Sequence, residues 1–237
     1  MSSELVSIIL PCYNEAGHLE KSIRLLYEEA NNFGFPYEFI FVEDKSKDNT
    51  RELLENLEPK IKNAQFIYHD SNKGRGAAVK SGVAVAKGNI IGFIDIDLEV
   101  SPRYIVQFVE ALKTNDAAIG NRKYFSDSVM RALIRDTVSN YYSSLNRKIL
   151  KHNYSDTEAG FKFFRRESLA PFFKLQTNDH WFWDTEFMMY CFNQQLKVSQ
   201  IEVDFLRDQT KKSTVNVLND SFYYLRELLK FRKQLKK

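Results

Sequence analysis

The first hundred residues alternate short apolar runs with segments of helical periodicity, and this alternation constrains the fold more than any other feature. The apolar runs are strand-like, over Leu5–Leu10, Tyr37–Val42, Gln65–Tyr68 and Asn89–Asp97. Between them, apolar residues recur at helical spacing over His18–Ala30, from Thr50 to Pro59, and over Ala77–Ala86. Strands and helices that alternate in this way form βαβ units. The sequence therefore predicts an α/β fold with a mostly parallel sheet flanked by helices.

The composition is ordinary for a globular domain and argues against several other classes of protein. The chain has 237 residues, 43% hydrophobic and 27% charged, which is enough for one domain with a full core. A formal net charge of +3 gives no indication of a nucleic-acid partner. Two cysteines, Cys12 and Cys191, make no disulfide framework, and neither a signal peptide nor a membrane-spanning run is expected. A cytoplasmic protein is predicted.

The run Asn89–Asp97 ends abruptly at two carboxylates, Asp95 and Asp97. In open α/β sheets the ligand site lies at the carboxyl ends of the strands. Polar residues follow the other strands as well, so an acidic edge is expected that gathers Asn14, Glu15, Glu43, Asp44, Asp95 and Asp97. Carboxylate ligands suit Mg²⁺ or Mn²⁺, and Mg²⁺ typically arrives with phosphates. Asp95 and Asp97 are the predicted metal ligands, and a solvated turn without metal is the alternative.

The turn Asn72–Gly76 is rich in glycine and opens the third helix. Its glycines let the backbone approach a ligand, and the start of a helix favours an anion. Lys73 and Arg75 add positive charge. The turn matches neither the Walker A loop nor Gly-x-Gly-x-x-Gly. It is predicted to contact the phosphates of a ligand, with an ordinary helix start as the alternative.

Four segments of the first half, taken in order, resemble the motifs of family 2 glycosyltransferases with the GT-A fold. They are Val6–Glu15, Glu43–Thr50, Asn72–Ala78 and Asp95–Leu98. The last of them corresponds to the Asp-x-Asp motif of that family. The resemblance implies a GT-A domain, a nucleotide-sugar donor and a divalent cation, Mg²⁺ or Mn²⁺.

The second half resembles one subgroup, the polyprenyl-phosphate sugar synthases that include dolichyl-phosphate mannose and glucose synthases. The matching segments are Gly120–Arg122, Arg135–Ser139, Asp156–Phe164, Trp183–Glu186 and Glu202–Arg207. This resemblance implies inverting transfer of a hexose from a UDP- or GDP-sugar to a polyprenyl phosphate. Two alternatives stay open: transfer to a saccharide in cell-surface polysaccharide synthesis, and a non-catalytic nucleotide-sugar-binding protein on the same fold.

The same resemblance assigns the donor site to residues of the first half. It implies that the nucleoside pocket is lined by Pro11, Tyr13 and Glu15, and that Asp44 accepts hydrogen bonds from the base. Asp95 would lie near the ribose and the metal. Asp97 would ligate the metal, which acts as a Lewis acid on the departing nucleoside diphosphate.

The acceptor decides whether the reaction needs a base. A phosphate monoester is already largely ionised, its second pKa being roughly 6, so it needs cations to hold it in line. Arginines suit that task, and those expected at the phosphate are Arg122, Arg135 and Arg207. Ser139 would donate a further hydrogen bond, and Arg131 is the alternative arginine for the same role. Asp156 and Asp184 would then orient arginines or the donor sugar. A sugar hydroxyl would instead need a base, supplied by Asp184 or Glu186.

The expected domain organisation is a GT-A domain followed by a basic tail helix. The GT-A domain covers residues 1–210, with a nucleotide-sugar-binding half over 1–100 and an acceptor half over 101–210. The helix over 211–237 is amphipathic, with Leu218, Phe222, Leu225 and Leu229 on one face. It either packs on the domain or makes a peripheral contact with the inner face of the membrane.

Overall fold

The computed structural model describes residues 4–125, 147, 149–150, 152–206 and 217–234. Their strands form one seven-stranded sheet in the order β3-β2-β1-β4-β6-β5-β7. The strands are β1 (Val6–Cys12), β2 (Tyr37–Glu43), β3 (Ala64–Tyr68), β4 (Ile90–Ile94), β5 (Ala117–Phe125), β6 (Phe161–Arg165) and β7 (Val198–Leu206). Every pairing is parallel except those of β6, which runs against β4 and β5. The prediction of a mostly parallel α/β sheet is confirmed.

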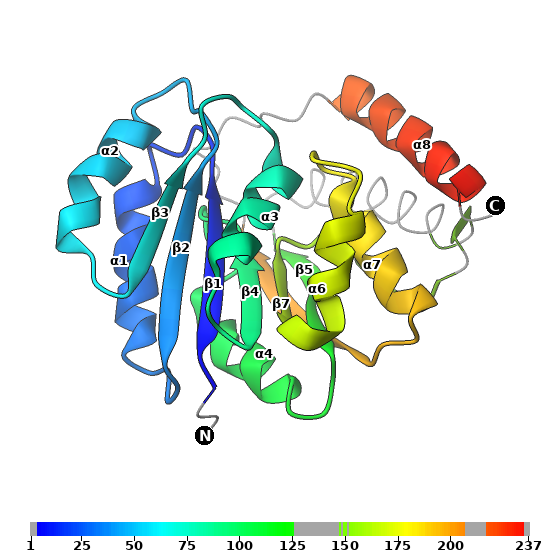
Figure 1. The fold of residues 1–237 in the computed structure, drawn as a ribbon, viewed down its shortest axis with the longest axis horizontal. Coiled ribbons are helices and arrows are strands. Elements are labelled where there is room, and N and C mark those ends of the chain that lie inside the picture. The colour runs from blue at the N-terminus through cyan, green and yellow to red at the C-terminus, as the bar shows by residue number, and fades with distance from the viewer. Residues whose placement is uncertain (1–3, 126–146, 148, 151, 207–216, 235–237) are drawn as a thin grey trace.

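Helices cover both faces of this sheet (Figure 1). One face carries α1 (Leu19–Ala30), α2 (Thr50–Leu57) and α4 (Ile105–Ala111), and the other carries α3 (Arg75–Val85), α6 (Arg166–Leu175) and α7 (Trp183–Asn193). Two short 3₁₀ turns, Glu58–Lys60 and Pro102–Tyr104, precede β3 and α4. Because side chains alternate along a strand, β1 feeds both layers: Ile8 packs with the first group and Ile9 with the second.

Two element boundaries differ from those expected, and both differences affect the residues at the carboxyl edge. Helix α3 begins at Arg75 and not at Ala77, because Gly74 adopts a φ of 99° that lets the chain turn directly into the helix. Strand β4 ends at Ile94. Asp95 and Asp97 therefore lie in the turn after the strand and are not part of it.

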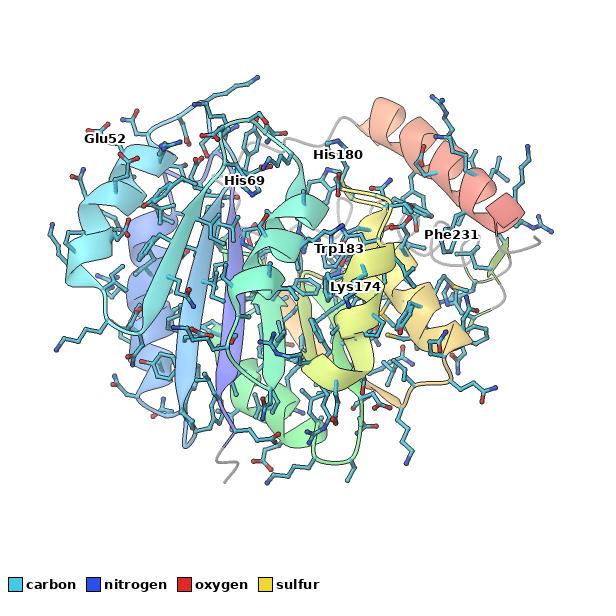
Figure 2. The ribbon with its side chains drawn as sticks, in the orientation of Figure 1. Glu52, His69, Lys174, His180, Trp183 and Phe231 are labelled. Atoms are coloured by element: carbon cyan, nitrogen blue, oxygen red, sulfur yellow. The ribbon has the colours of Figure 1, made fainter. Side chains whose placement is uncertain are left out.

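The tail contains a helix, α8 (Val217–Gln234), which lies against α7 on the side of the molecule opposite α1 and α2 (Figure 1). Its Leu228 is buried in a small cluster with Phe182 and Met189. The Tyr224 hydroxyl lies 2.9 Å from Thr185 Oγ1, and the ring of Phe231, labelled in Figure 2, lies 5.8 Å from the ring of Phe182. These contacts fit the packing alternative, whereas contact with a membrane stays a prediction. Within the described segments, none of the helices combines the length and apolar character that a membrane crossing requires.

His152 makes the stability of the fold depend on pH. Its ring is buried beside Tyr154, whose backbone N–H donates to His152 Nδ1 at 3.2 Å. Burial, together with the positive charge of Arg147, lowers the pKa of His152 from 6.5 to about 4. The unfolded chain therefore binds more protons than the folded one between these two values, and stability falls as the pH falls from 6.5 towards 4.

We expect the unfolding temperature to be a few degrees lower at pH 4.5 than at pH 7. For a domain of this size, a loss of about 1 kcal/mol in the free energy of unfolding lowers the unfolding temperature by roughly 2–4 °C. Thermal unfolding followed by circular dichroism measures it. His152→Gln should flatten this dependence, and the exposed His180→Gln should not. Equal slopes for His152→Gln and the unmodified protein would contradict the assignment.

Candidate active site

The strand order reverses between β1 and β4, because β2 and β3 lie on one side of β1 and β4 lies on the other. Open α/β sheets bind ligands at such a switch point, outside the carboxyl ends of the strands. The first residue of β6, Phe161, pairs with Ile94 at the end of β4, since β6 runs the other way. The loop before β6 therefore reaches the same edge as the turn after β4, and it brings Asp156 and Gly160 towards Asp95.

The turn after β4 holds both carboxylates of the Asp-x-Asp segment. The Asp95 N–H donates to the Gly160 carbonyl at 3.0 Å, and the Leu98 N–H closes the turn on the Asp95 carbonyl at 3.1 Å. Asp95, Asp97 and Glu99 line one small cavity of about 10 Å³, close to the space that a single water molecule needs. The turn thus presents oxygen ligands at the switch point.

These carboxylates fit a divalent cation that arrives with its substrate. Mg²⁺ is usually held by one or two carboxylates and by substrate phosphates, not by a cage made of protein alone. In the part of the chain that the structure describes, no three His, Cys, Asp or Glu side chains form such a cage. Gly160 leaves the necessary room, because a Cβ there would stand 1.7 Å from Asp95 Oδ2. Asp95 and Asp97 remain the predicted ligands.

A chain of alternating charges runs from Asp95 into the interior. Arg75 Nε donates to Asp95 Oδ1 at 2.9 Å, and Arg75 Nη1 donates to Asp184 Oδ2. Lys162 Nζ donates to the other oxygen of Asp184 at 2.5 Å and to the Ala159 carbonyl at 2.6 Å. Burial opposes the charge on Lys162 and lowers its pKa, although Asp184 acts in the opposite direction. We call these four side chains, Asp95, Arg75, Asp184 and Lys162, the charge chain.

Arg75 is the centre of this chain and stays charged. Burial opposes its charge, but Asp184 and Asp95 outweigh burial, so the pKa of Arg75 is raised. Three aromatic rings surround the guanidinium at 5.6, 5.7 and 5.8 Å, those of Phe93, Trp181 and Trp183. Trp183 is fully buried, whereas Trp181 is 55% exposed and closes the site from the solvent side.

The carboxylate of Asp44 occupies the position where an anion was expected at the glycine turn. It is buried and accepts four hydrogen bonds, from His69 Nδ1 at 2.7 Å, Asn72 Nδ2 at 3.0 Å, and the N–H groups of Lys73 and Gly74 at 2.8 Å each. A carboxylate only accepts, so His69 Nδ1 carries a proton, and His69 Nε2 lies 2.9 Å from the Ser81 hydroxyl oxygen. Asp44 thereby fixes the turn from which Arg75 extends. Its predicted contact with a nucleobase stays a prediction.

Replacing Asp44 with asparagine is expected to lower the free energy of unfolding by about 2–3 kcal/mol. The amide would turn N–H groups towards the donors of the glycine turn, and hydrogen bonds to a charged group contribute about 1.5–3 kcal/mol each. Urea unfolding measures the difference. The exposed Asp70→Asn serves as the matched control and should leave the midpoint unchanged. An unchanged midpoint for Asp44→Asn would show that the turn holds its shape without the carboxylate.

The loop after β1, which contains Tyr13 and Glu15, is tied to the loop after β2. The N–H of Asn14 donates to Ser46 Oγ at 3.0 Å, and the N–H of Glu15 donates to Thr50 Oγ1 at 2.7 Å. Pro11 is half-buried at the end of β1. These residues therefore stand at the carboxyl edge beside Asp44, where the nucleoside is predicted to bind.

Arg122 and Asp156 form a bidentate ion pair on the acceptor side of the edge. Arg122 Nε lies 2.6 Å from Asp156 Oδ2, and Nη2 lies 3.0 Å from Oδ1. Burial works against ionisation of Asp156, but the guanidinium outweighs it and keeps the pKa of Asp156 below its usual value. The rings of Tyr124 and Phe205 each lie 5.6 Å from the guanidinium carbon. Asp156 thus holds one of the predicted phosphate-binding arginines in a fixed orientation.

Glu186 points away from the charge chain and organises the loop before α7. It is buried, and its carboxylate accepts hydrogen bonds from the Thr177 hydroxyl and from the backbone N–H groups of Thr177 at 3.2 Å and Asn178 at 3.0 Å. The same loop meets α3, where Ala77 N–H donates to the Asp179 carbonyl at 3.1 Å. In Figure 2, His180 extends from this loop near the edge that also carries His69. Glu186 therefore supports the loop that carries Trp181.

Four predicted site residues lie outside the described residues: Arg131, Arg135, Ser139 and Arg207. Their roles stay predictions. Conversely, the structure places three residues in the site for which no role was predicted, namely His69, Gly160 and Lys162. Lys162 could have been identified from the sequence, because it is a charged residue among the apolar residues Phe161, Phe163 and Phe164 of a strand-like segment. His69 directly follows β3, as Asp44 follows β2, so its position at a strand end could have placed it at the carboxyl edge.

Comparisons of the sequence with known proteins identify the family of this chain. The family whose sequence model matches residues 7–173 is described as Glycosyl transferase family 2. Glycosyltransferase AglD of Haloferax volcanii is 31% identical over 205 residues, covering 84% of this chain and 33% of that protein. A dolichyl-phosphate beta-glucosyltransferase of Dictyostelium discoideum is 24% identical over 242 residues, covering 96% of this chain and 73% of that protein. The chain thus spans only a third of the length of the Haloferax relative.

Solved structures share the fold at low identity. Glucosyl-3-phosphoglycerate synthase of Mycobacterium tuberculosis, in complex with Mn²⁺, UDP and phosphoglyceric acid, has a TM-score of 0.72 at 16% identity over 95% of this chain and 76% of that one. The mannosyltransferase PcManGT of Pyrobaculum calidifontis, in complex with GDP-Man and Mn²⁺, has a TM-score of 0.60 at 17% identity over 88% of this chain and 59% of that one. These neighbours establish the GT-A fold. Because the family match extends over most of the chain and its carboxyl edge carries the Asp-x-Asp turn, the protein belongs to glycosyl transferase family 2.

Proposed function

We propose that the chain transfers a hexose, with inversion, from a UDP- or GDP-sugar to a polyprenyl phosphate. The proposal is supported by the relatives named dolichyl-phosphate beta-glucosyltransferases, among them one from Trichomonas vaginalis that is 27% identical over 86% of this chain and 66% of its own length. The neighbours with bound UDP or GDP-Man support a nucleotide-sugar donor.

The choice of acceptor rests on the burial and the hydrogen bonds of the two candidate bases. Asp184 and Glu186 are 1% and 6% exposed. Asp184 places one oxygen on Lys162 and the other on Arg75, and both oxygens of Glu186 accept hydrogen bonds from the loop before α7. Neither carboxylate is placed to take a proton from an incoming sugar hydroxyl. An acceptor that arrives already ionised, such as a phosphate monoester, avoids this need.

On the acceptor side, Arg122 supplies the charge that a phosphate requires. Its guanidinium is aligned by Asp156 and lies against two aromatic rings, so little side-chain freedom is lost when an anion binds. On the donor side, Asp95 and Asp97 would hold Mg²⁺ or Mn²⁺ together with the two phosphates. The cation, when bound, supplies positive charge that stabilises the departing nucleoside diphosphate.

A transfer assay tests the proposal. Purified protein with Mn²⁺ and either labelled UDP-glucose or labelled GDP-mannose is mixed with a short polyprenyl phosphate, and the label in the lipid phase is counted. Arg122→Ala should transfer little label, whereas Arg51→Ala, which removes an arginine of α2 whose side chain is 37% exposed, is the matched control and should transfer normally.

Label in the lipid phase supports the proposed acceptor and identifies the donor. Donor cleavage with label only on added saccharides would exclude the lipid acceptor in favour of polysaccharide synthesis. Nucleotide binding without turnover of any donor would instead indicate a binding protein on the transferase fold.

A further inference from the structure

A fully buried lysine stands at the end of the charge chain, and neither the predicted donor contacts nor the predicted acceptor contacts use it. The Lys162 side chain is 0% exposed, and Lys162 is the second residue of β6. Removing an ammonium group from water is costly unless it is paired and hydrogen-bonded. Among the described residues, Lys162 meets that condition through Asp184 and the Ala159 carbonyl. A well-packed apolar residue would fill the same place without this cost, so the charge calls for an explanation.

The order of the charges in the charge chain explains why Lys162 is charged. Two carboxylates and two cations alternate from Asp95 to Lys162, so each interior charge is balanced by its neighbours. Asp184 is held from one side by Lys162 Nζ and from the other by Arg75 Nη1. With one Asp184 oxygen engaged by Lys162, Arg75 can turn its Nε and Nη2 towards Asp95 Oδ1, at 2.9 and 2.8 Å.

At the other end of the charge chain, Asp95 is much more exposed to solvent than the remaining three side chains. Asp95 is 43% exposed, whereas the Arg75, Asp184 and Lys162 side chains are 10%, 2% and 0% exposed. Gly160 also confines the Asp95 carboxylate, because any Cβ there would overlap it. The buried part of the charge chain therefore constrains Asp95, one of the two carboxylates predicted to bind the metal.

We propose that Lys162 is a positioning residue of the donor site: it holds Asp184, which holds Arg75, which orients the Asp95 carboxylate for the metal–nucleotide complex. Without Lys162, the freed oxygen of Asp184 draws the Arg75 guanidinium into a two-pronged contact, and Arg75 leaves Asp95. Partners that orient a metal ligand typically contribute about 10–100-fold to metal affinity or activity. The inference rests on the proposed function to the extent that Asp95 binds a metal–nucleotide complex.

Isothermal titration calorimetry of the full chain tests the proposal, with UDP and GDP each titrated in the presence of Mn²⁺. The Lys162→Met variant, which keeps the length of the side chain and removes the charge, should weaken binding of the preferred nucleotide with Mn²⁺ about 10–100-fold. Lys174→Met, an exposed lysine of α6 labelled in Figure 2, is the matched control and should bind as the unmodified protein does.

Two further variants separate positioning from stability. Leu26→Ala removes a fully buried side chain of α1, on the face of the sheet opposite α3 and α7, and should lower the unfolding temperature without weakening Mn²⁺–nucleotide binding. The double variant Lys162→Met with Asp184→Asn leaves no unpaired interior charge, so it should fold even if the single variant does not. In the double variant Arg75 has lost its ion pair with Asp184, which leaves Arg75 less firmly held against Asp95. Mn²⁺–nucleotide binding should therefore stay about tenfold or more weaker than in the unmodified protein.

Normal Mn²⁺–nucleotide binding by Lys162→Met or by the double variant would overturn the positioning role, and so would an equal loss of binding by Leu26→Ala. If the unmodified chain bound neither nucleotide with Mn²⁺, the proposed function itself would fail, and the positioning role would fail with it. The two failures are therefore distinguishable, because only the second affects the unmodified protein.

Discussion

Gly160→Ala is expected to abolish most transferase activity, lowering kcat by about a hundredfold or more. The new methyl group would stand 1.7 Å from Asp95 Oδ2, 2.3 Å from its Cγ and 2.8 Å from Arg75 Nη2. No real contact is that short, so the Asp95 carboxylate has to move by an ångström or more. A displacement of about 1 Å in a reacting assembly costs roughly a hundredfold in rate. Steady-state kinetics at saturating donor and Mn²⁺ measure the loss.

Gly17→Ala provides the control for this substitution. Gly17 lies in the loop between β1 and α1, and a Cβ there would meet nothing within 4 Å. The same chemical change should therefore leave kcat unchanged. Activity of Gly160→Ala within about threefold of the unmodified protein would mean that the Asp95 carboxylate is not needed where the structure places it.

Arg122→Ala is expected to have the second large effect, on both activity and stability. Loss of the guanidinium removes the cation predicted to hold the acceptor phosphate, and removal of one such preorganised donor typically costs about 10²–10³ in rate. It also leaves Asp156, whose side chain is 13% exposed, without its ion-pair partner. Breaking one side of a buried pair typically destabilises a protein by about 3–5 kcal/mol.

A second variant separates these two effects. The double variant Arg122→Ala with Asp156→Ala removes the stranded carboxylate, so most of the stability should return while transfer stays low. Arg103→Ala is the control, since it removes an exposed arginine that pairs with Asp204 on the surface. Recovery of transfer in the double variant would show that Arg122 supports only the fold and does not hold the acceptor.

The sequence predicted which residues reach the ligand edge, because that depends on the ends of strands. The alternation of strands and helices placed Asp44, Asp95 and Asp97 at the carboxyl edge, and the confirmed parallel sheet puts them there. Family resemblance added the second half, where Asp156 and Asp184 were expected to orient arginines. The ion pairs with Arg122 and Arg75 have the form that such a role requires.

The partners of each side chain could not be predicted from spacing. Asp184 meets Arg75 across 109 positions of sequence, and no local pattern encodes that contact. The glycine turn was predicted to contact the phosphates of a ligand. In the structure its N–H groups at Lys73 and Gly74 donate instead to the carboxylate of Asp44, which directly follows β2. Sequence periodicity indicates which face or edge a residue occupies, whereas burial and pairing depend on which distant segments meet there.

The reversed strand β6 has a consequence for how the molecule folds. It follows β4 and β5 in the chain but lies between them in the sheet, so it joins the strands β3, β2, β1 and β4 to the pair formed by β5 and β7. The pairings among the first four strands are themselves long-range, from Phe39 with Ala64 to Val6 with Ile90, and long-range parallel pairings form slowly. The sheet closes only when β6 enters the central gap, and β6 brings Gly160 and Lys162 with it. The donor site is therefore completed in the same event that closes the sheet, and nucleotide affinity reports on the finished fold.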